Sequence, residues 1–178
     1  MSDVSVFSSR YNTFHSTFKE TSLDSENNYY LCTDESQRII DFDKLLEDRY
    51  PNSNERPNSF DAIYIDGNNI HCIEFKNQKP SKINNQDIRD KLQEGKDELV
   101  KVFQEQNIQI NDLNFIYSVV YRECKSYKDK YKCGIVQTQI EFGLEKYKDN
   151  GFVKEIFTSD VNFFTRAFRL KFKKELAC

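Results

Sequence analysis

Two short runs of apolar and alternating residues lie close together in the middle of the chain, FDAIYID at 60–66 and IHCIEFK at 70–76. Gly67, Asn68 and Asn69 separate them. Residues of this kind between two strand-like runs are typical of a tight turn. The pattern predicts a β-hairpin.

The next segments alternate between helical and strand-like periodicity. Apolar residues recur at helical spacing from Asn85 to Gln106, which predicts a long helix with one buried face. The almost unbroken apolar run at 113–121 is typical of a central strand buried on both sides, and 135–142 favours another strand. Residues 160–176 look helical. The buried positions expected on the long helix are Ile88, Leu92, Leu99, Val102 and Phe103.

The N-terminal part contains aromatic residues at spacings of four, three and four, which places them on one face of a predicted helix. That face either packs on the core or contacts a partner subunit in a homodimer. Residues 21–35 are polar and indicate a loop, and a second helix is expected from Ser36 to Arg49, ended by Pro51. The aromatic residues are Phe7, Tyr11, Phe14 and Phe18.

This order of elements predicts a mixed α/β fold around a small sheet. The length of 178 residues fits one domain. Within it we distinguish an N-terminal helical extension at 1–35, a core with the hairpin at 36–121, and a basic loop with C-terminal elements at 122–178.

Composition narrows the function classes. The chain is 38% hydrophobic and 14% aromatic, as expected of a globular protein. Its 26 basic and 29 acidic residues give a net charge of only −3, which argues against a polybasic nucleic-acid binder. No run of 18 apolar residues and no secretory signal is evident, so we expect a cytoplasmic protein without a membrane partner.

The cysteines are odd in number, widely spaced and without a C-x-x-C pair. This pattern favours reduced thiols over a disulfide framework or a zinc site. The five positions are Cys32, Cys72, Cys124, Cys133 and Cys178.

The hairpin carries the candidate chemistry. A two-residue loop and a four-residue loop both place Asp61 directly opposite Glu74, whereas a three-residue loop would not. Directly opposed residues of an antiparallel pair point to the same face. Lys76 lies two positions after Glu74, so strand alternation puts it on that face as well. Two carboxylates and an ammonium group are therefore expected to converge.

Two carboxylates that face each other among apolar neighbours need a neutralising partner. A Mg²⁺ ion, which prefers oxygen ligands, would fit between Asp61 and Glu74, with the backbone carbonyl of Phe75 as a third ligand. Lys76 would then orient an attacking water or stabilise charge on a phosphate.

The sequence S-F-D, twelve further residues, then E-F-K, resembles the PD-(D/E)XK nuclease superfamily, which includes many restriction endonucleases and Holliday-junction resolvases. The resemblance covers residues 36–121. It implies a restriction-endonuclease-like mixed sheet flanked by helices, and Mg²⁺-dependent hydrolysis of DNA by a metal-activated water, with Mn²⁺ able to replace Mg²⁺. It assigns metal ligation to Asp61 and Glu74 and a catalytic role to Lys76.

Other positions follow or depart from the same pattern. Gln78 matches the extended E-x-K-x-Q form of some members and would lie near the scissile phosphate. Phe60 stands where the name of the motif has proline. The acid that the family carries on its first helix has two candidates by helical phase, Asp43 and Glu47, with Glu35 a weaker third.

Several alternatives remain at this stage. The hairpin could be a salt-bridged surface feature, with Lys76 pairing with an acid across the strands. The chain could also be an inactive nuclease-fold module that binds nucleic acid or a protein, or a toxin-like enzyme that acts on RNA. Three regions are candidates for contact with a nucleic-acid backbone. Their residues are Lys79 and Lys82 after the hairpin, Lys125, Lys128, Lys130 and Lys132 in the basic loop, and Arg166 and Arg169 near the C-terminus.

Overall fold

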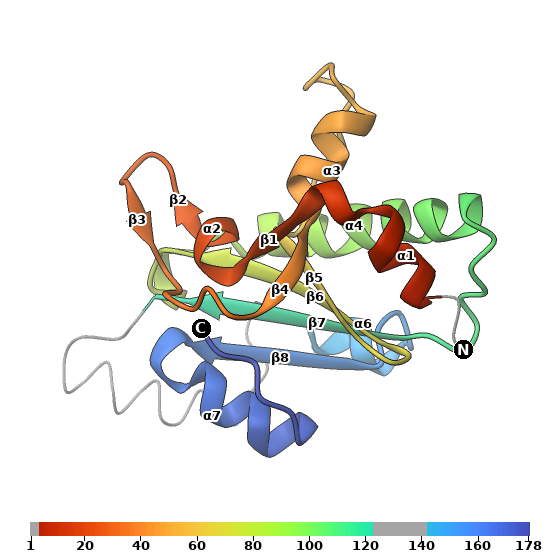
Figure 1. Ribbon diagram of the computed structural model, residues 1–178. Helices are drawn as coiled ribbons and strands as arrows, with labels where there is room; N and C mark the ends of the chain where they lie inside the picture. The colour runs from red at the N-terminus through yellow and green to blue at the C-terminus, as the bar shows by residue number, and fades with distance from the viewer. Residues whose placement is uncertain (1–3, 123–141) are drawn as a thin grey trace.

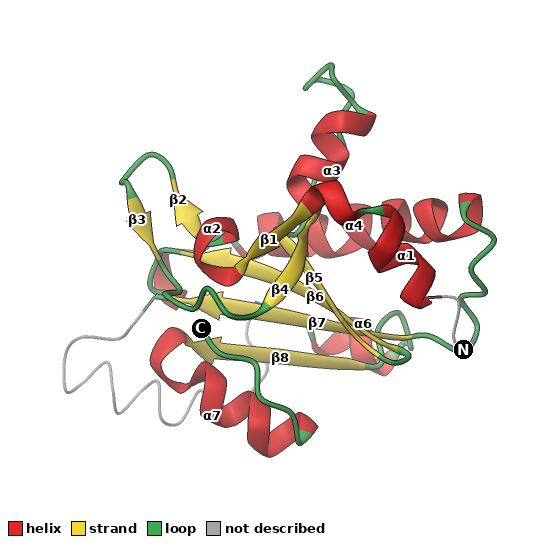
Figure 2. Ribbon diagram, in the orientation of Figure 1, coloured by secondary structure: helices red, strands yellow, loops and turns green. Residues whose placement is uncertain are grey.

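A mixed six-stranded sheet with helices on both faces forms the body of the protein (Figures 1 and 2). The computed structural model describes residues 4–122 and 142–178. The strands of the sheet are β1 (His15–Thr17), β4 (Arg38–Asp41), β5 (Ala62–Asp66), β6 (Asn69–Lys76), β7 (Asn114–Tyr121) and β8 (Glu155–Asp160), and a separate hairpin consists of β2 (Leu23–Asp24) and β3 (Tyr29–Tyr30).

The helices divide between the two faces of the sheet. α1 (Val4–Arg10), α3 (Phe42–Arg49), α4 (Asn85–Glu105) and α6 (Glu145–Asp149) contribute to one hydrophobic core, whereas α2 (Phe18–Thr21) and α7 (Val161–Phe172) contribute to another. Two short 3-10 helices, η1 (Asn12–Phe14) and η2 (Pro80–Lys82), precede β1 and α4. The sheet therefore has an α4 side and an α7 side.

The strand order is β1-β4-β5-β6-β7-β8. Neighbouring strands from β1 to β6 are antiparallel, whereas β6, β7 and β8 are parallel. A parallel neighbour needs a long crossover, and α4 is the crossover between β6 and β7. The predicted hairpin, β5 and β6, thus occupies the middle of the sheet.

Strand alternation decides which side chains of β6 meet α4. Ile70 and Cys72 belong to the core on the α4 side, and Ile73 and Phe75 belong to the core on the α7 side. Glu74 and Lys76 follow Ile70 and Cys72 at steps of two along the strand, so their side chains lie on the same face. Both charged side chains are consequently directed toward α4.

The structure confirms the elements with the clearest periodicity. The hairpin, the long helix α4 and the buried central strand β7 are all present. α7 lies within the C-terminal segment expected to be helical. The residues expected to be buried on α4 are all buried. The coarse prediction of a mixed α/β fold around a sheet is therefore correct.

The prediction of one helix from Phe7 to Phe18 is wrong. α1 ends at Arg10, and η1, β1 and α2 follow within the same segment. Phe7 lies in the core on the α4 side and Phe18 in the core on the α7 side, each fully buried. The aromatic residues hence form no single face, because their 4-3-4 spacing comes from a broken segment that passes from one face of the sheet to the other.

Two neighbouring predictions also need correction. The helix expected over Ser36–Arg49 begins only at Phe42, because Arg38–Asp41 forms β4 between β1 and β5. The side chain of Asp41 accepts a hydrogen bond from the amide of Lys44 and caps this helix. The segment 21–35, expected to be a loop, contains the β2–β3 hairpin.

The C-terminal part was incompletely predicted. α6 (Glu145–Asp149) and β8 (Glu155–Asp160) lie in a polar stretch in which no helix or strand was expected. The expected strand at 135–142 lies outside the described residues, apart from Phe142, and so do residues 123–132 of the expected basic loop. Strands β1 and β8 show that both flanking segments, 1–35 and 122–178, contribute to the same sheet.

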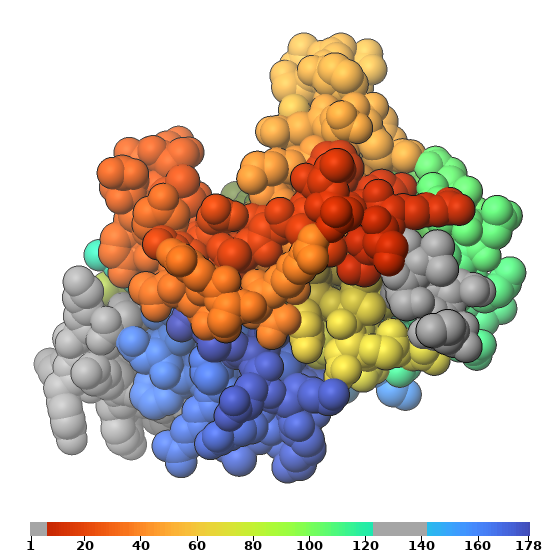
Figure 3. Space-filling view, in the orientation of Figure 1, coloured from red at the N-terminus to blue at the C-terminus, as the bar shows by residue number. Residues whose placement is uncertain are grey.

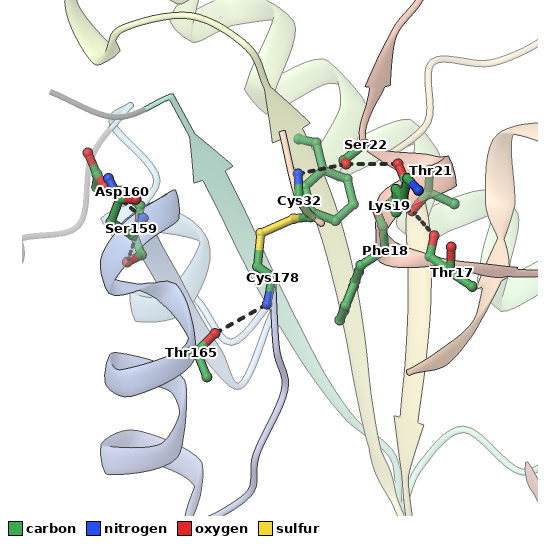
Figure 4. The surroundings of a disulfide bond; sticks show 12 residues. Thr17, Phe18, Lys19, Thr21, Ser22, Cys32, Ser159, Asp160, Thr165 and Cys178 are labelled. Atoms are coloured by element: carbon green, nitrogen blue, oxygen red, sulfur yellow. Dashed lines mark hydrogen bonds between the residues drawn. A yellow bond between two sulfur atoms is a disulfide. The ribbon is translucent and has the colours of Figure 1, made fainter. Parts of the chain in front are cut away.

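The expectation of reduced cysteines is wrong for two of the five. Cys32 and Cys178 form a disulfide across a sequence separation of 146 residues (Figure 4). Only the fold brings them together, so no local spacing could indicate the bond. Cys72 is free and buried, and Cys124 and Cys133 lie outside the described residues. None of the helices in residues 4–122 and 142–178 has the length and apolar character needed to cross a bilayer.

Candidate active site

The register of the hairpin is the one that brings the predicted residues together. Asp66 pairs with Asn69 and Ala62 with Ile73, around a two-residue turn whose Gly67 has a φ of 58°. Continuing this register by one position places Asp61 opposite Glu74. Asp61 also accepts a hydrogen bond from the amide of Phe75, with 2.5 Å between nitrogen and Oδ2.

Glu74 is fully buried and contacts two ammonium groups. The Nζ atoms of Lys76 and Lys91 lie 3.0 and 2.8 Å from its Oε1. Lys91, which comes from α4, is also 3.6 Å from Oδ1 of Asp61. Because Glu74 has an exposed fraction of 0%, the pair with Lys76 is not a surface salt bridge. A lysine from the neighbouring helix thus lies between the two carboxylates.

A third carboxylate, Asp43, joins the cluster from the first turn of α3. It accepts a hydrogen bond from the hydroxyl of Ser59 and interacts with Asp61 and Lys91. The backbone positions it, because the amide of Phe42 donates to the carbonyl of Asp61 over 2.9 Å.

α4 can approach this cluster closely because of one glycine. A Cβ atom at Gly95 would lie 2.9 Å from ring carbons of Phe60, the residue directly before Asp61. Contacts of this length are not tolerated between carbon atoms. The absence of a side chain at Gly95 therefore lets α4 bring its charged residues to the hairpin.

The cluster contains more negative than positive groups. Lys76 is shared with a fourth carboxylate, Asp87 in the first turn of α4, at 2.6 Å. Among residues 4–122 and 142–178, the cations that contact this group of Asp43, Asp61, Glu74 and Asp87 are Lys76 and Lys91. The arrangement would be balanced by two further positive charges.

Burial is the main cause of the shifted pKa values in this cluster. Burial and the nearby Glu74 raise the pKa of Asp61 well above its ordinary value. Burial also raises the pKa of Glu74, despite the two lysines, and that of Asp43. Burial acts in the opposite direction on Lys91, but Glu74 and Asp61 outweigh it and raise its pKa. The carboxylates are therefore held in a state that favours a bound proton or a cation.

The cluster opens into a cleft of about 250 Å³. One wall comes from the end of β6 and the adjoining residues, and the other comes from α2 and the β2–β3 hairpin. Figure 3 shows this hairpin projecting from the body, with a hollow beside it on the side of α3. The predicted site residues that line the cleft are Asp61, Phe75, Lys76 and Gln78.

Within the described part of the chain, no three histidine, cysteine or carboxylate side chains are arranged to hold a metal ion. The ammonium of Lys91 lies 3.6 Å from Asp61 and 2.8 Å from Glu74, between the two carboxylates that were expected to hold the ion. The donor chemistry nevertheless suits a hard divalent cation, because Asp43, Asp61 and Glu74 supply only carboxylate oxygens and carry excess negative charge.

The remaining predicted residues lie in different places. Of the candidate acids of the first helix, Asp43 joins the cluster, whereas Glu47 pairs with Arg56 and Glu35 with Lys19. Lys79 and Lys82 are exposed just beyond the hairpin.

The basic residues near the C-terminus are separated from the cluster. Those of the expected basic loop lie outside the described residues. Arg166 and Arg169 are exposed on α7, which covers the face of the sheet opposite α4, and Arg169 pairs with Glu175. The expected phosphate contacts outside the described residues are Lys125, Lys128, Lys130 and Lys132.

Sequence reasoning missed Lys91 and Asp87. They are four residues apart, and each directly precedes a core position, Leu92 and Ile88 respectively. Residues four apart share one face of a helix, so both could have been placed together at the edge of the buried stripe. Nothing in the sequence alone directed that edge toward Glu74.

Comparison with family models, curated proteins and solved structures finds no match to this chain.

Proposed function

We propose that this chain is a metal-dependent nuclease of the PD-(D/E)XK kind, with a restriction-endonuclease-like fold, which hydrolyses phosphodiester bonds of DNA with Mg²⁺ or Mn²⁺. The observation that carries the proposal is the convergence of Asp61, Glu74 and Lys76. Asp61 and Lys76 line one cleft, and the buried Glu74 lies 3.0 Å from Lys76.

The carboxylates supply the cation-binding groups. Asp61 and Glu74 would hold the ion, with Asp43 as the acid of the first helix. The ion would act as a Lewis acid on the scissile phosphate. Because the pKa values of these carboxyl groups are raised, a cation replaces bound protons and relieves the repulsion between the acids.

Lys76 and Gln78 act on the substrate. The ammonium of Lys76 is held between Glu74 and Asp87 and borders the cleft, where it stabilises negative charge on the phosphate during the reaction. Gln78 lines the same cleft two residues further on and donates to a phosphate oxygen.

Lys91 has a separate role in this proposal. Its ammonium contacts and neutralises Glu74 and Asp61. Lys91 thereby keeps Asp43, Asp61 and Glu74 compatible with the fold before the substrate arrives. The ammonium would have to leave Glu74 and Asp61 for an ion to bind between the two carboxylates.

A cleavage assay tests the proposal. Purified protein is incubated with supercoiled DNA, linear DNA and RNA in Mg²⁺, Mn²⁺ or EDTA, beside the variant Glu74→Gln. We expect DNA cleavage that requires the metal and is lost in the variant. Cleavage that persists in EDTA, or in Glu74→Gln, would remove the proposed centre. Cleavage of RNA but not of DNA would support the alternative of a toxin-like enzyme that acts on RNA.

The second candidate function is a nuclease-fold module that binds nucleic acid without cutting it. Lys91 favours this candidate, because an internal ammonium can neutralise the acids permanently. The discriminating result is binding of nucleic acid together with no cleavage of any substrate in either metal.

A further inference from the structure

The β2–β3 hairpin forms one wall of the cleft and is anchored at several points. Its Asp24 accepts a hydrogen bond from the side-chain amide of Asn77 on the opposite wall, over 2.9 Å. At its base the hydroxyl of Ser22 accepts a hydrogen bond from the amide of Cys32, over 2.9 Å, and the disulfide follows directly (Figure 4). The hairpin is thus held beside the candidate active site.

The same hairpin carries exposed rings. Among the described residues, the exposed large hydrophobic side chains include three from this hairpin, Leu23, Tyr29 and Tyr30, with exposed fractions of 39, 47 and 39%. Tyr29 and Tyr30 are successive residues of a strand, so their rings point to opposite faces.

The two tyrosines face different cations. The guanidinium carbon of Arg122 lies 6.0 Å from the ring centre of Tyr29. The amide of Arg122 donates to the carbonyls of Lys76 and Gln78, over 3.0 and 3.1 Å, which places this pair at the end of β6 beside the cleft. Tyr30 instead faces Lys19, whose ammonium is occupied by Glu35.

We infer that Tyr29 and Arg122 form a subsite for an unpaired nucleotide next to the scissile phosphate. The base stacks on the ring of Tyr29, and Arg122 contacts the adjoining phosphate. The inference rests on the proposed nuclease function and names its substrate as single-stranded or locally unpaired nucleic acid.

Size and charge both favour a single strand. Small-ligand sites are typically roughly 300–1,000 Å³, so the cleft of about 250 Å³, which Tyr29 and Arg122 adjoin without lining it, is too small to enclose a duplex. Asp24 and Glu26 line the hairpin wall of the cleft and repel a second phosphate backbone. Arg122 offers phosphates a favourable path past Tyr29.

The test measures binding without cleavage. A fluorescently labelled oligothymidylate and a labelled duplex of the same length are titrated in EDTA, and fluorescence anisotropy gives the dissociation constants. The proteins are the wild type, Tyr29→Ala, Tyr29→Phe and the matched control Tyr30→Ala, each first checked for an unchanged melting temperature.

Loss of a stacking ring costs roughly five- to a hundredfold in affinity per base. We expect a loss in this range for Tyr29→Ala with the single strand, near wild-type binding for Tyr29→Phe and Tyr30→Ala, and no change with the duplex. Arg122→Gln should weaken single-strand binding and reduce its salt dependence by about one phosphate contact.

Equal losses for Tyr29→Ala and Tyr30→Ala, or no single-strand binding by the wild type, would overturn the subsite. Tyr29-dependent binding by a protein that cuts nothing would keep the subsite and refute the nuclease. Metal-dependent cleavage by the wild type, combined with unchanged single-strand binding by Tyr29→Ala, would support the nuclease and refute the subsite.

Discussion

Two buried glutamates of this protein each contact two cations, yet their pKa values shift in opposite directions. Glu98 on α4 is 1% exposed and lies 3.3 Å from Arg49 and 3.0 Å from Lys101. Burial alone would raise its pKa, but hydrogen bonds from Lys101 and Tyr50 lower it below the ordinary value. Glu74 has equally close lysines, and its pKa is raised.

Burial decides the direction: it outweighs the two lysines at Glu74, whereas the hydrogen bonds to Glu98 outweigh it there. The two sites also differ in how many acids share the cations. Around Glu98 the second carboxylate, Glu105, is bound by the same Arg49, so two acids face two bases. Around Glu74, the lysines are shared with Asp61, Asp43 and Asp87. A cluster with excess buried charge costs stability, and perturbed carboxyl groups of this kind are enriched at functional sites.

The largest expected contrast comes from neutralising each glutamate. Glu74→Gln should lower metal-dependent DNA cleavage by about a thousandfold, because a cation that contributes several kcal/mol loses a ligand. Glu98→Gln should leave cleavage unchanged and lower the free energy of unfolding by about 2 kcal/mol. Single-turnover cleavage rates and chemical denaturation measure the two effects. Equal loss of cleavage in both variants would contradict the distinction.

Substitutions of the two lysines at Glu74 should have different effects, and the effect of Lys76 is the larger. Lys76→Met is expected to slow cleavage by about a hundredfold, as for loss of one group that stabilises transition-state charge. Mn²⁺ binding should not weaken, because Lys76 is not a ligand. Cleavage rates and calorimetric titration with Mn²⁺ provide the two readouts. A variant that cuts DNA at the normal rate would exclude the assigned role.

Lys91→Met should instead act on the metal. Its ammonium competes with a cation for Asp61 and Glu74, so its removal should tighten Mn²⁺ binding by about tenfold. The matched control is Lys101→Met at Glu98, which should leave Mn²⁺ affinity unchanged. Weaker binding in Lys91→Met would show that this lysine supports the site rather than competes with the ion.

The smallest effect is expected on stability without metal. Asp61→Asn should raise the free energy of unfolding in EDTA at neutral pH by about 1 kcal/mol, because one of two facing charges is removed. For a chain of this size that corresponds to roughly 2–4 °C in melting temperature. The asparagine can still accept the hydrogen bond from the amide of Phe75. A lower melting temperature in EDTA would contradict this prediction.

The same variant should show a defined pH dependence. The folded-state pKa of Asp61 is raised above its ordinary value of 3.8, so between these two values the folded state binds the proton more tightly. The stability cost of Asp61 is consequently present at higher pH and disappears as pH falls toward 3.8. The advantage of Asp61→Asn should shrink over that range. His71, whose pKa burial lowers to about 4, is common to both proteins and cancels in the difference.

The sequence predicted the part of the site that depends on local rules. Strand alternation and turn length determine the positions of Asp61, Glu74 and Lys76, and helical periodicity determines α4. Lys91 could not be assigned, because its position depends on how α4 packs against the hairpin. β8 was missed because its buried residues include Thr158, Ser159 and Asp160, which give a weak hydrophobic signal.

The other errors arise from long-range contacts. The aromatic spacing from Phe7 to Phe18 imitates a helix, but the two phenylalanines pack on opposite faces of the sheet. The pairing of Cys32 with Cys178 joins distant segments. Neither contact is specified by residues near it in the sequence.

Calorimetric titration of Mn²⁺ into the wild type and the double variant Asp61→Asn, Glu74→Gln tests the central claim most directly. The account predicts saturable binding to the wild type, with protons released because the ion replaces them on carboxyl groups of raised pKa. It predicts no binding to a folded double variant. Equal Mn²⁺ binding by both proteins would contradict a cation site between these two strands.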